Sequence, residues 1–148
     1  MKKLLPVALS IASVALLGQS SIANGMPPTP IPCYFFKGEK LVIQNTCIYE
    51  SARWAGGMSA NLTWEDGVST SISYGISPVR GEGKVCPRNS EYLKIDSVCG
   101  PRYHRYLKNL KRISKADNDR LFRDDSLRVV QCTQLKDTSV CWRVAGFN

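Results

Sequence analysis

The chain has 148 residues, of which 43% are hydrophobic, 22% charged and 9% aromatic, and its 20 Lys and Arg outnumber its 12 Asp and Glu. This length allows one ordinary domain, and the composition fits neither a disordered chain nor a fibre. Because the one long apolar run lies at the extreme N-terminus, the sequence also excludes a multi-pass membrane protein.

The N-terminal segment has the three parts of a secretory signal peptide. Two lysines precede an apolar run over residues 4–17, and Ser21-Ile22-Ala23 places small residues at both recognition positions. The run is shorter than the ~20 residues that span a bilayer. We therefore expect a signal peptide over residues 1–23 and no membrane span after its cleavage.

Residues 24–32 hold four prolines and no periodicity, which predicts an extended spacer. A single disulfide-stabilised, β-rich domain is expected to follow over residues 33–148. Its first strand is predicted at residues 39–44.

The next segment is typical of a β-hairpin, because residues 61–64 and 68–74 alternate apolar and polar side chains around Glu65-Asp66-Gly67. A three-residue loop, with Gly67 in the left-handed position of a bulge, puts the apolar side chains on one face. The cross-strand pairs predicted by this register are Trp64 with Val68, Leu62 with Thr70, and Ala60 with Ile72.

Further strands are expected at residues 92–98, 127–134 and 139–144, and one helix at residues 115–124. Ser114 as N-cap with Asp117 three residues later approximates a capping box. Residues 103–113 have apolar positions at helical spacing, but an irregular crossing followed by a strand fits equally well. The predicted fold is β-rich, all-β or α+β: a small antiparallel barrel or sandwich of about six strands with one short helix, stapled by disulfides.

The chain has six cysteines, all beyond the expected cleavage site, and an even number in an exported chain favours disulfides. The near neighbours in sequence are Cys33 with Cys47, Cys86 with Cys99, and Cys132 with Cys141. A two-residue turn at Lys136-Asp137 would set Cys132 directly opposite Cys141, at a separation that suits a disulfide. There is no Cys-x2-Cys knuckle and one histidine, so we expect neither a metal nor a cofactor.

The excess positive charge lies in the C-terminal part, where residues 98–148 hold eleven basic and five acidic groups. No acid occurs between Asp96 and Asp117, and the basic residues there are Arg102, Arg105, Lys108, Lys111, Arg112 and Lys115. This pattern suits an anionic polymer, anionic lipid head groups or an acidic protein surface, or else a solvated face neutralised by the acids that follow. Nucleic acid is a poor partner for an exported protein, and none is expected.

A second candidate is Trp54, which is followed by the paired glycines Gly56 and Gly57. On a surface loop its ring would stack on a sugar or anchor a partner. Alternatively, the ring belongs to the core and the glycines serve a turn.

Catalytic patterns are mostly absent, since the chain has no Gly-x-Ser-x-Gly, Ser-x-x-Lys or His-Glu-x-x-His motif. The leading hypothesis is a non-enzymatic binding module, secreted or periplasmic, whose segment 102–115 contacts an anionic polymer or protein of the cell envelope. The alternatives are a periplasmic enzyme inhibitor that inserts the loop at residues 54–58, and a small hydrolase that uses His104.

Three stretches carry a resemblance to known proteins. They are Cys33-x-Phe35-Phe36-x-Gly38-x-x-Leu41-x-Ile43-x-x-Thr46-Cys47, Trp54-Ala55-Gly56-Gly57, and Leu62-x-Trp64-Glu65-Asp66-Gly67-Val68. In these the chain resembles small secreted cysteine-containing proteins of cyanobacteria, which implies export and disulfides but no catalytic residue. A fainter similarity is to the inhibitors of C-type lysozyme, small β-barrels whose Ser-Gly-x-x-Tyr loop is matched here only by the rearranged Ser73-Tyr74-Gly75.

Overall fold

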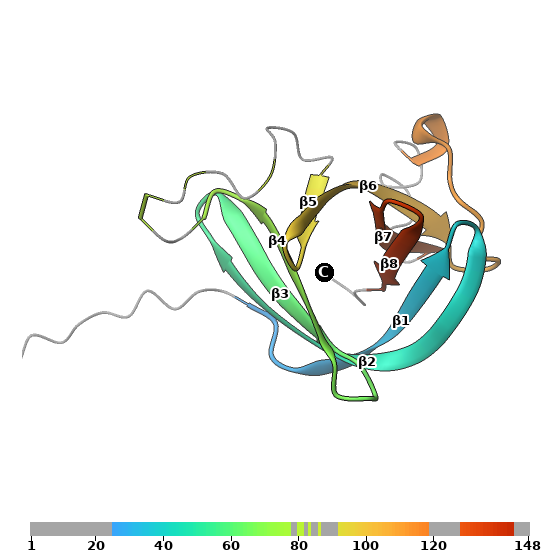
Figure 1. Cartoon of the computed structure of the whole chain (residues 1–148), viewed down its shortest axis with the longest axis horizontal. Helices are drawn as coiled ribbons and strands as arrows, with labels where there is room; N and C mark the ends of the chain where they lie inside the picture. The colour runs from blue at the N-terminus through green and yellow to red at the C-terminus, as the bar shows by residue number, and fades with distance from the viewer. Residues whose placement is uncertain are drawn as a thin grey trace, which may run out of the picture.

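The computed structural model describes residues 25–77, 80, 81, 83, 86, 92–118 and 128–143. These residues form eight antiparallel strands that close into a barrel (Figure 1). The predicted β-rich barrel or sandwich with disulfides is confirmed, with eight strands in place of about six. The expected signal peptide lies outside the described residues.

Each strand of the barrel pairs with the next one in the chain, and β8 pairs with β1 to close the ring. The strands are β1 (Thr29–Lys37), β2 (Lys40–Trp54), β3 (Gly57–Thr63), β4 (Ser69–Gly75), β5 (Tyr92–Ile95), β6 (Val98–Tyr106), β7 (Val129–Leu135) and β8 (Thr138–Trp142). The strand expected at residues 39–44 is the start of the much longer β2. Those expected at 127–134 and 139–144 correspond, within the described residues, to β7 and β8.

The hairpin of β3 and β4 has the predicted register. Leu62 pairs with Thr70 and Ala60 with Ile72, and the backbone N–H of Trp64 donates to the carbonyl of Val68 at 2.8 Å. Gly67 has a φ of 83°, the left-handed conformation that the three-residue loop requires. The strict alternation of apolar and polar residues was therefore enough to fix this register.

The hairpin of β7 and β8 also matches its prediction. Cys132 pairs directly with Cys141 and the two form a disulfide across a turn at Lys136 and Asp137. Lys136 has a φ of 56°, so this two-residue turn uses a left-handed residue without glycine. The predicted bond between Cys86 and Cys99 is present as well.

The third predicted disulfide is wrong, because Cys33 and Cys47 are free and buried. In the register of β1 and β2, Cys33 pairs with Asn45 while Cys47 pairs with Ile31. The two cysteines are therefore diagonal neighbours on one face, and Cα atoms in that relation are about 7–8 Å apart, beyond the usual range for a disulfide. The two bonded pairs are consistent with an oxidising compartment.

The proline-rich segment is not a spacer throughout, because Thr29–Pro32 belongs to β1 and Ile31 is buried in the core. Met26 is also bonded to β2: its carbonyl accepts from the N–H of Ser51 at 3.0 Å, and its N–H donates to the hydroxyl of Ser51 at 3.2 Å. The prolines are tolerated because β1 pairs with β8 only from Cys33 onward. The folded domain thus begins before residue 33.

Residues 92–98 were expected to form a single strand, but they contain β5, a turn and the first residue of β6. β5 ends at Ile95, Asp96 takes a φ of 50°, and β6 begins at Val98. Asp96 stabilises this turn, since its carboxylate accepts from the N–H of Ser71 at 2.9 Å. Of the two structures open for residues 103–113, the helix is wrong, since β6 continues to Tyr106.

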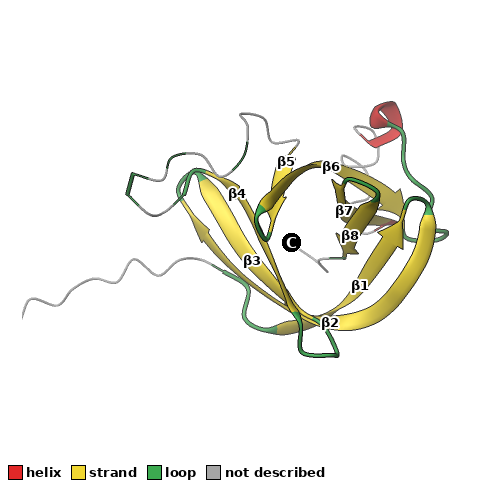
Figure 2. Cartoon of the chain, in the orientation of Figure 1, coloured by secondary structure: helices red, strands yellow, loops and turns green. Residues whose placement is uncertain are grey.

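The predicted helix start is confirmed. Residues 115–118 are helical (red in Figure 2), and the hydroxyl of Ser114 accepts from the backbone N–H of Asp117 at 3.2 Å while donating to its carboxylate at 2.8 Å. Residues 119–124 of this helix lie outside the described residues. In the ranges that the structure describes, no helix has the length and apolar character that a bilayer crossing requires.

Side chains that point into the barrel form an apolar core. Its least exposed large members are Ile31, Tyr49, Leu62, Ile72, Leu93, Ile95 and Trp142. The free thiols of Cys33 and Cys47 belong to this core, and burial raises the pKa of both. Buried apolar side chains therefore fill the interior of the barrel.

A second cluster lies on the outer side of the barrel. Because neighbouring residues of a strand point to opposite faces, Cys33 and Val140 point inward, whereas Tyr34 and Cys141 point outward. The cluster consists of Tyr34, Phe36, Tyr103, Val130, Cys132 and Cys141, with Leu41, Leu107 and Leu110 packed against it. We call the outer side of β1, β6, β7 and β8 the covered face, and the outer side of β2, β3 and β4 the open face.

Candidate functional site

The predicted basic segment folds back along the end of β6. The carbonyl of Lys111 accepts from the N–H of Tyr106 at 3.0 Å, and the N–H of Ile113 donates to the carbonyl of His104 at 2.9 Å. The turn between them contains Asn109, whose side chain accepts from the N–H of Lys111 at 3.0 Å, an arrangement that asparagine favours. We call residues 104–113 the basic hairpin.

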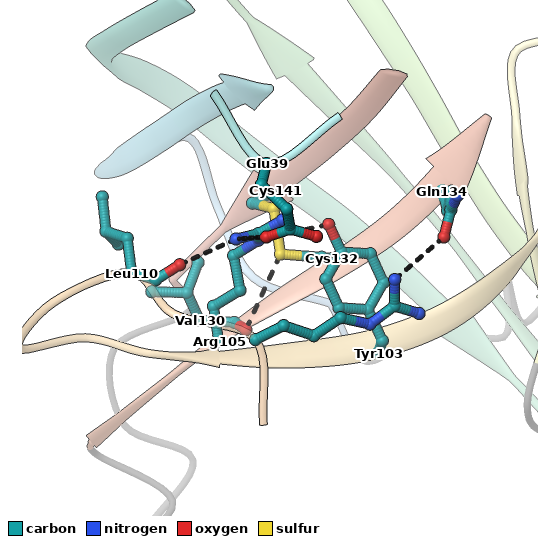
Figure 3. Close-up of a disulfide and its surroundings, with 9 residues drawn as sticks. Glu39, Tyr103, Arg105, Leu110, Val130, Cys132, Gln134 and Cys141 are labelled. Carbon is teal, nitrogen blue, oxygen red and sulfur yellow. Dashed lines mark hydrogen bonds and ion pairs between the residues drawn. A yellow bond between two sulfur atoms is a disulfide. The ribbon is translucent and has the colours of Figure 1, made fainter. Parts of the chain in front are cut away.

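Arg105 is the residue that holds the basic hairpin to the covered face (Figure 3), and it is only 1% exposed. One terminal nitrogen of its guanidinium donates to the carboxylate of Glu39 and to the carbonyl of Leu110, both at 2.8 Å. Its Nε donates to the Tyr103 hydroxyl at 3.2 Å, and its Cζ lies 4.0 Å from the centre of the Phe36 ring. These contacts join β6, the basic hairpin and the β1–β2 turn.

This burial corrects one part of the sequence hypothesis, which assigned Arg105 to the ligand-contacting set. A strand of alternating basic and aromatic residues has two sides, and Arg105 shares its side with Tyr103 on the covered face. The buried guanidinium pairs with the largely exposed carboxylate of Glu39 at 2.8 Å, so Arg105 is a structural residue here.

Arg112 stands directly opposite Arg105 in an antiparallel bridge, yet it is exposed. Its guanidinium carbon lies 4.1 Å from the centre of the Tyr103 ring, and one terminal nitrogen donates to the side-chain oxygen of Gln134 at 3.1 Å. The ring and the amide together fix the position of this exposed cation.

The remaining basic residues of the segment are more accessible. Lys108, Lys111 and Lys115 are exposed, whereas Arg102 on β6 is half-buried. Arg128 joins them from a distant part of the sequence, because its carbonyl accepts from the N–H of Leu107 at 2.7 Å and its own side chain is exposed. The sequence contained no signal for this neighbour, which depends on how β7 returns beside β6.

Trp54 is neither a core residue nor a free loop residue. It pairs with Gly57 at the end of β2, and a Cβ atom built on Gly57 would lie 2.7 Å from Cζ2 of the indole. The ring thus lies over Gly57 on the open face, which explains why glycine is required there. Its Nε1 donates to the carbonyl of Ile76 at 2.8 Å, so the ring is held in place.

His104 points inward from β6 and is 5% exposed. Burial, together with the charge of Arg102, lowers the pKa of His104 to about 4, while a hydrogen bond with Asn118 opposes this shift. The imidazole is therefore neutral at pH 7 and lies away from solvent. Among the residues that the structure describes, no three His, Cys, Asp or Glu side chains come together as metal ligands would.

Geometrically, this is a small eight-stranded up-and-down barrel with an exposed basic hairpin clamped to its outer side. Comparisons with protein-family models, with curated proteins and with solved structures find no significant match. The function of this barrel therefore has to be inferred from its side chains.

Proposed function

We propose that the protein is an exported, non-enzymatic binding module, secreted or periplasmic, whose basic hairpin contacts an anionic polymer or protein of the cell envelope. One observation carries this proposal: the exposed cations follow one another on a segment whose backbone is fixed against β6 and whose base is clamped by the buried Arg105. The exposed cations of the basic hairpin are Lys108, Lys111 and Arg112, and Lys115 follows just beyond it.

Rigid presentation matters because binding then orders fewer backbone degrees of freedom, and more of the interaction energy appears as affinity. The positive potential of such a patch also accelerates encounters with an anionic partner, more strongly at low salt. The two disulfides support export, since they persist in oxidising compartments.

The two alternative functions have less support from the geometry. An inhibitor that inserts Trp54 into a cleft would have to release its indole from Gly57 and from the carbonyl of Ile76. A hydrolase would have to bring substrate to His104, whose imidazole is buried inside the barrel. Neither residue presents a reactive or mobile group at the surface.

The test is pelleting of the oxidised protein with purified cell-wall material across a salt series. The Debye length shortens from ~10 Å at 0.1 M to ~3 Å at 1 M salt, so binding through the basic hairpin should be strong at low salt and lost at high salt. Charge reversal of the exposed Lys108 and Lys111 to Glu should abolish pelleting.

The matched control reverses Lys37 and Lys40, two exposed lysines that flank the β1–β2 turn and lie outside the hairpin. This variant has the same net charge as the first one and should still pellet. An equal loss in both variants would show that net charge acts in place of the hairpin, and no binding of the wild type at low salt would contradict the proposal.

A further inference from the structure

Two guanidinium groups lie side by side on the covered face. Arg105 and Arg112 are directly opposed across the bridge, an arrangement that brings like charges together at a cost in stability. Both approach the ring of Tyr103, with their Cζ atoms 5.3 Å and 4.1 Å from its centre. The aromatic ring that both cations approach offsets part of that cost through its electron-rich face.

Only one carboxylate among the described residues contacts this pair. Glu39 pairs with Arg105 at 2.8 Å, whereas the partners of Arg112 are the neutral amide of Gln134 and the ring of Tyr103. Within the described residues the pair therefore has one positive charge that no carboxylate contacts, and it is located on Arg112, the exposed member.

Arg112 also differs from the lysines around it in how it is held. Lys108 and Lys111 are exposed on flexible four-carbon stems, and each presents a hydrated point charge. The guanidinium of Arg112 is fixed by Tyr103 and Gln134, so the N–H groups not used for Gln134 keep a defined direction. A planar fork held in this way matches the two oxygens of a carboxylate or a phosphate.

We propose that Arg112 is a preorganised receptor for an oxyanion, the carboxylate or phosphate groups of the anionic partner, and that the neighbouring lysines add only diffuse attraction. This assignment rests on the proposed function, because it names the chemical group that the basic hairpin recognises. Tyr103 and Gln134 are its positioning residues. Arg105 holds the Tyr103 hydroxyl by a hydrogen bond and is itself paired with Glu39.

The first test uses small oxyanions in place of a polymer. Labelled full-length mature protein is titrated with sodium acetate and, separately, with sodium phosphate, while the Nε–Hε signals of the arginines are followed by NMR. The signal of Arg112 should shift with saturation, and that of the buried Arg105 should not. The acetate and phosphate arms distinguish the two sources of oxyanion, and the absence of any shift at Arg112 in either arm would overturn the assignment.

The second test compares variants against polyglutamate and polyphosphate at one salt concentration. Arg112→Lys keeps the charge but loses the planar fork, so its affinity should fall about tenfold. Lys111→Gln removes a charge at the neighbouring position and should lower affinity only about two- to threefold. Gln134→Ala leaves every charge in place and should give an intermediate loss, which separates positioning from charge.

The outcomes of the two tests separate the two proposals. If wild-type protein binds a polymer and Arg112→Lys binds it equally well, the receptor assignment is overturned while the binding function stands. If no polymer is bound but small oxyanions shift the NMR signal of Arg112, the receptor assignment stands and the proposal of a polymeric partner is wrong. Thermal unfolding of each variant confirms that the fold is intact.

Discussion

The open face and the covered face are two parts of one continuous sheet, but only the open face is exposed to solvent along its length. On β3 and β4 buried and exposed residues alternate, as expected for strands with one side in the core. On β8 four of five residues are buried, because both sides of that strand are packed. The outer side of β8 belongs to a second apolar cluster that side chains of β1, β6 and β7 form, with Leu107 and Leu110 of the basic hairpin packed against it.

The comparison predicts that stability depends far more on charged and polar groups of the covered face than on those of the open face. On the open face the side-chain hydrogen bonds are exposed, and the one between Asn61 and Glu50 is 3.4 Å long. On the covered face the buried side chain of Arg105 makes three hydrogen bonds, one of them buried and two partly buried.

The largest effect is expected from Arg105→Ala. The substitution leaves the carbonyl of Leu110 and the hydroxyl of Tyr103 without their partner and opens a space beside Phe36, so the free energy of unfolding should fall by about 3–4 kcal/mol. Urea unfolding measures this, with the exposed Lys111→Ala as a control that should change stability by less than about 0.5 kcal/mol. Similar values for the two variants would show that the buried contacts of Arg105 do not stabilise the covered face.

A pH-dependent effect of similar size is expected from His104, which points inward from the doubly covered β6. On lowering the pH, the unfolded histidine takes up a proton near its ordinary pKa of 6.5, but the folded one does so only at about 4. Its contribution to stability is therefore full above pH 6.5 and is lost toward pH 4, on the order of 3 kcal/mol. The difference in unfolding free energy between wild type and His104→Gln, measured from pH 7 to 4, should show this slope; parallel profiles would contradict it.

Removal of the disulfide on the covered face should cost slightly less. Cys132 and Cys141 are nine residues apart, and opening so short a loop with the double Cys→Ala variant should cost about 2–3 kcal/mol in urea unfolding without reductant. The thiol count is an independent check, since denatured, unreduced wild type should react at two thiols, those of Cys33 and Cys47. Reaction at none would mean that the third disulfide exists after all.

The smallest effect is expected on the open face. Asn61→Ala removes one long, exposed hydrogen bond to Glu50, and the free energy of unfolding should change by less than about 0.5 kcal/mol. Thermal unfolding of Asn61→Ala and Arg105→Ala under the same conditions measures both substitutions on one scale. A decrease in the free energy of unfolding above about 1 kcal/mol would show that polar contacts of the open face also stabilise the fold, although they are exposed.

The same difference explains which parts of the fold were predictable from the sequence. The β3–β4 register followed from alternation because one side of that hairpin faces water. On β6 the apolar residues lie on both sides, which gives no period of two, and residues 103–113 were compatible with a helix as well as a strand. The non-glycine turn at Asp96 hid the division of residues 92–98 in the same way.

The candidate site was predictable in its charges but not in their burial. The cluster of basic residues is visible in the sequence, and four of its members are exposed as expected. The burial of Arg105 depends on Glu39, which lies 66 residues away and has no local pattern that would mark it as a partner. Contacts of this range follow from barrel closure, which a reading of neighbouring residues does not reveal.

The prolines of β1 have a further consequence for self-association. The carbonyl of Pro32 accepts from the N–H of Arg143, so this carbonyl points toward the β8 edge of β1. In an antiparallel strand the nitrogen of a residue points to the same edge as its carbonyl, and alternate residues share that direction. The ring nitrogens of Pro32 and Pro30 therefore both face this edge. Beyond the last pair with β8, this edge of β1 therefore lacks two of the N–H groups that an added strand from another molecule would need. Pro30 and Pro32, in the segment expected to be a spacer, thus disfavour edge-to-edge pairing with another molecule.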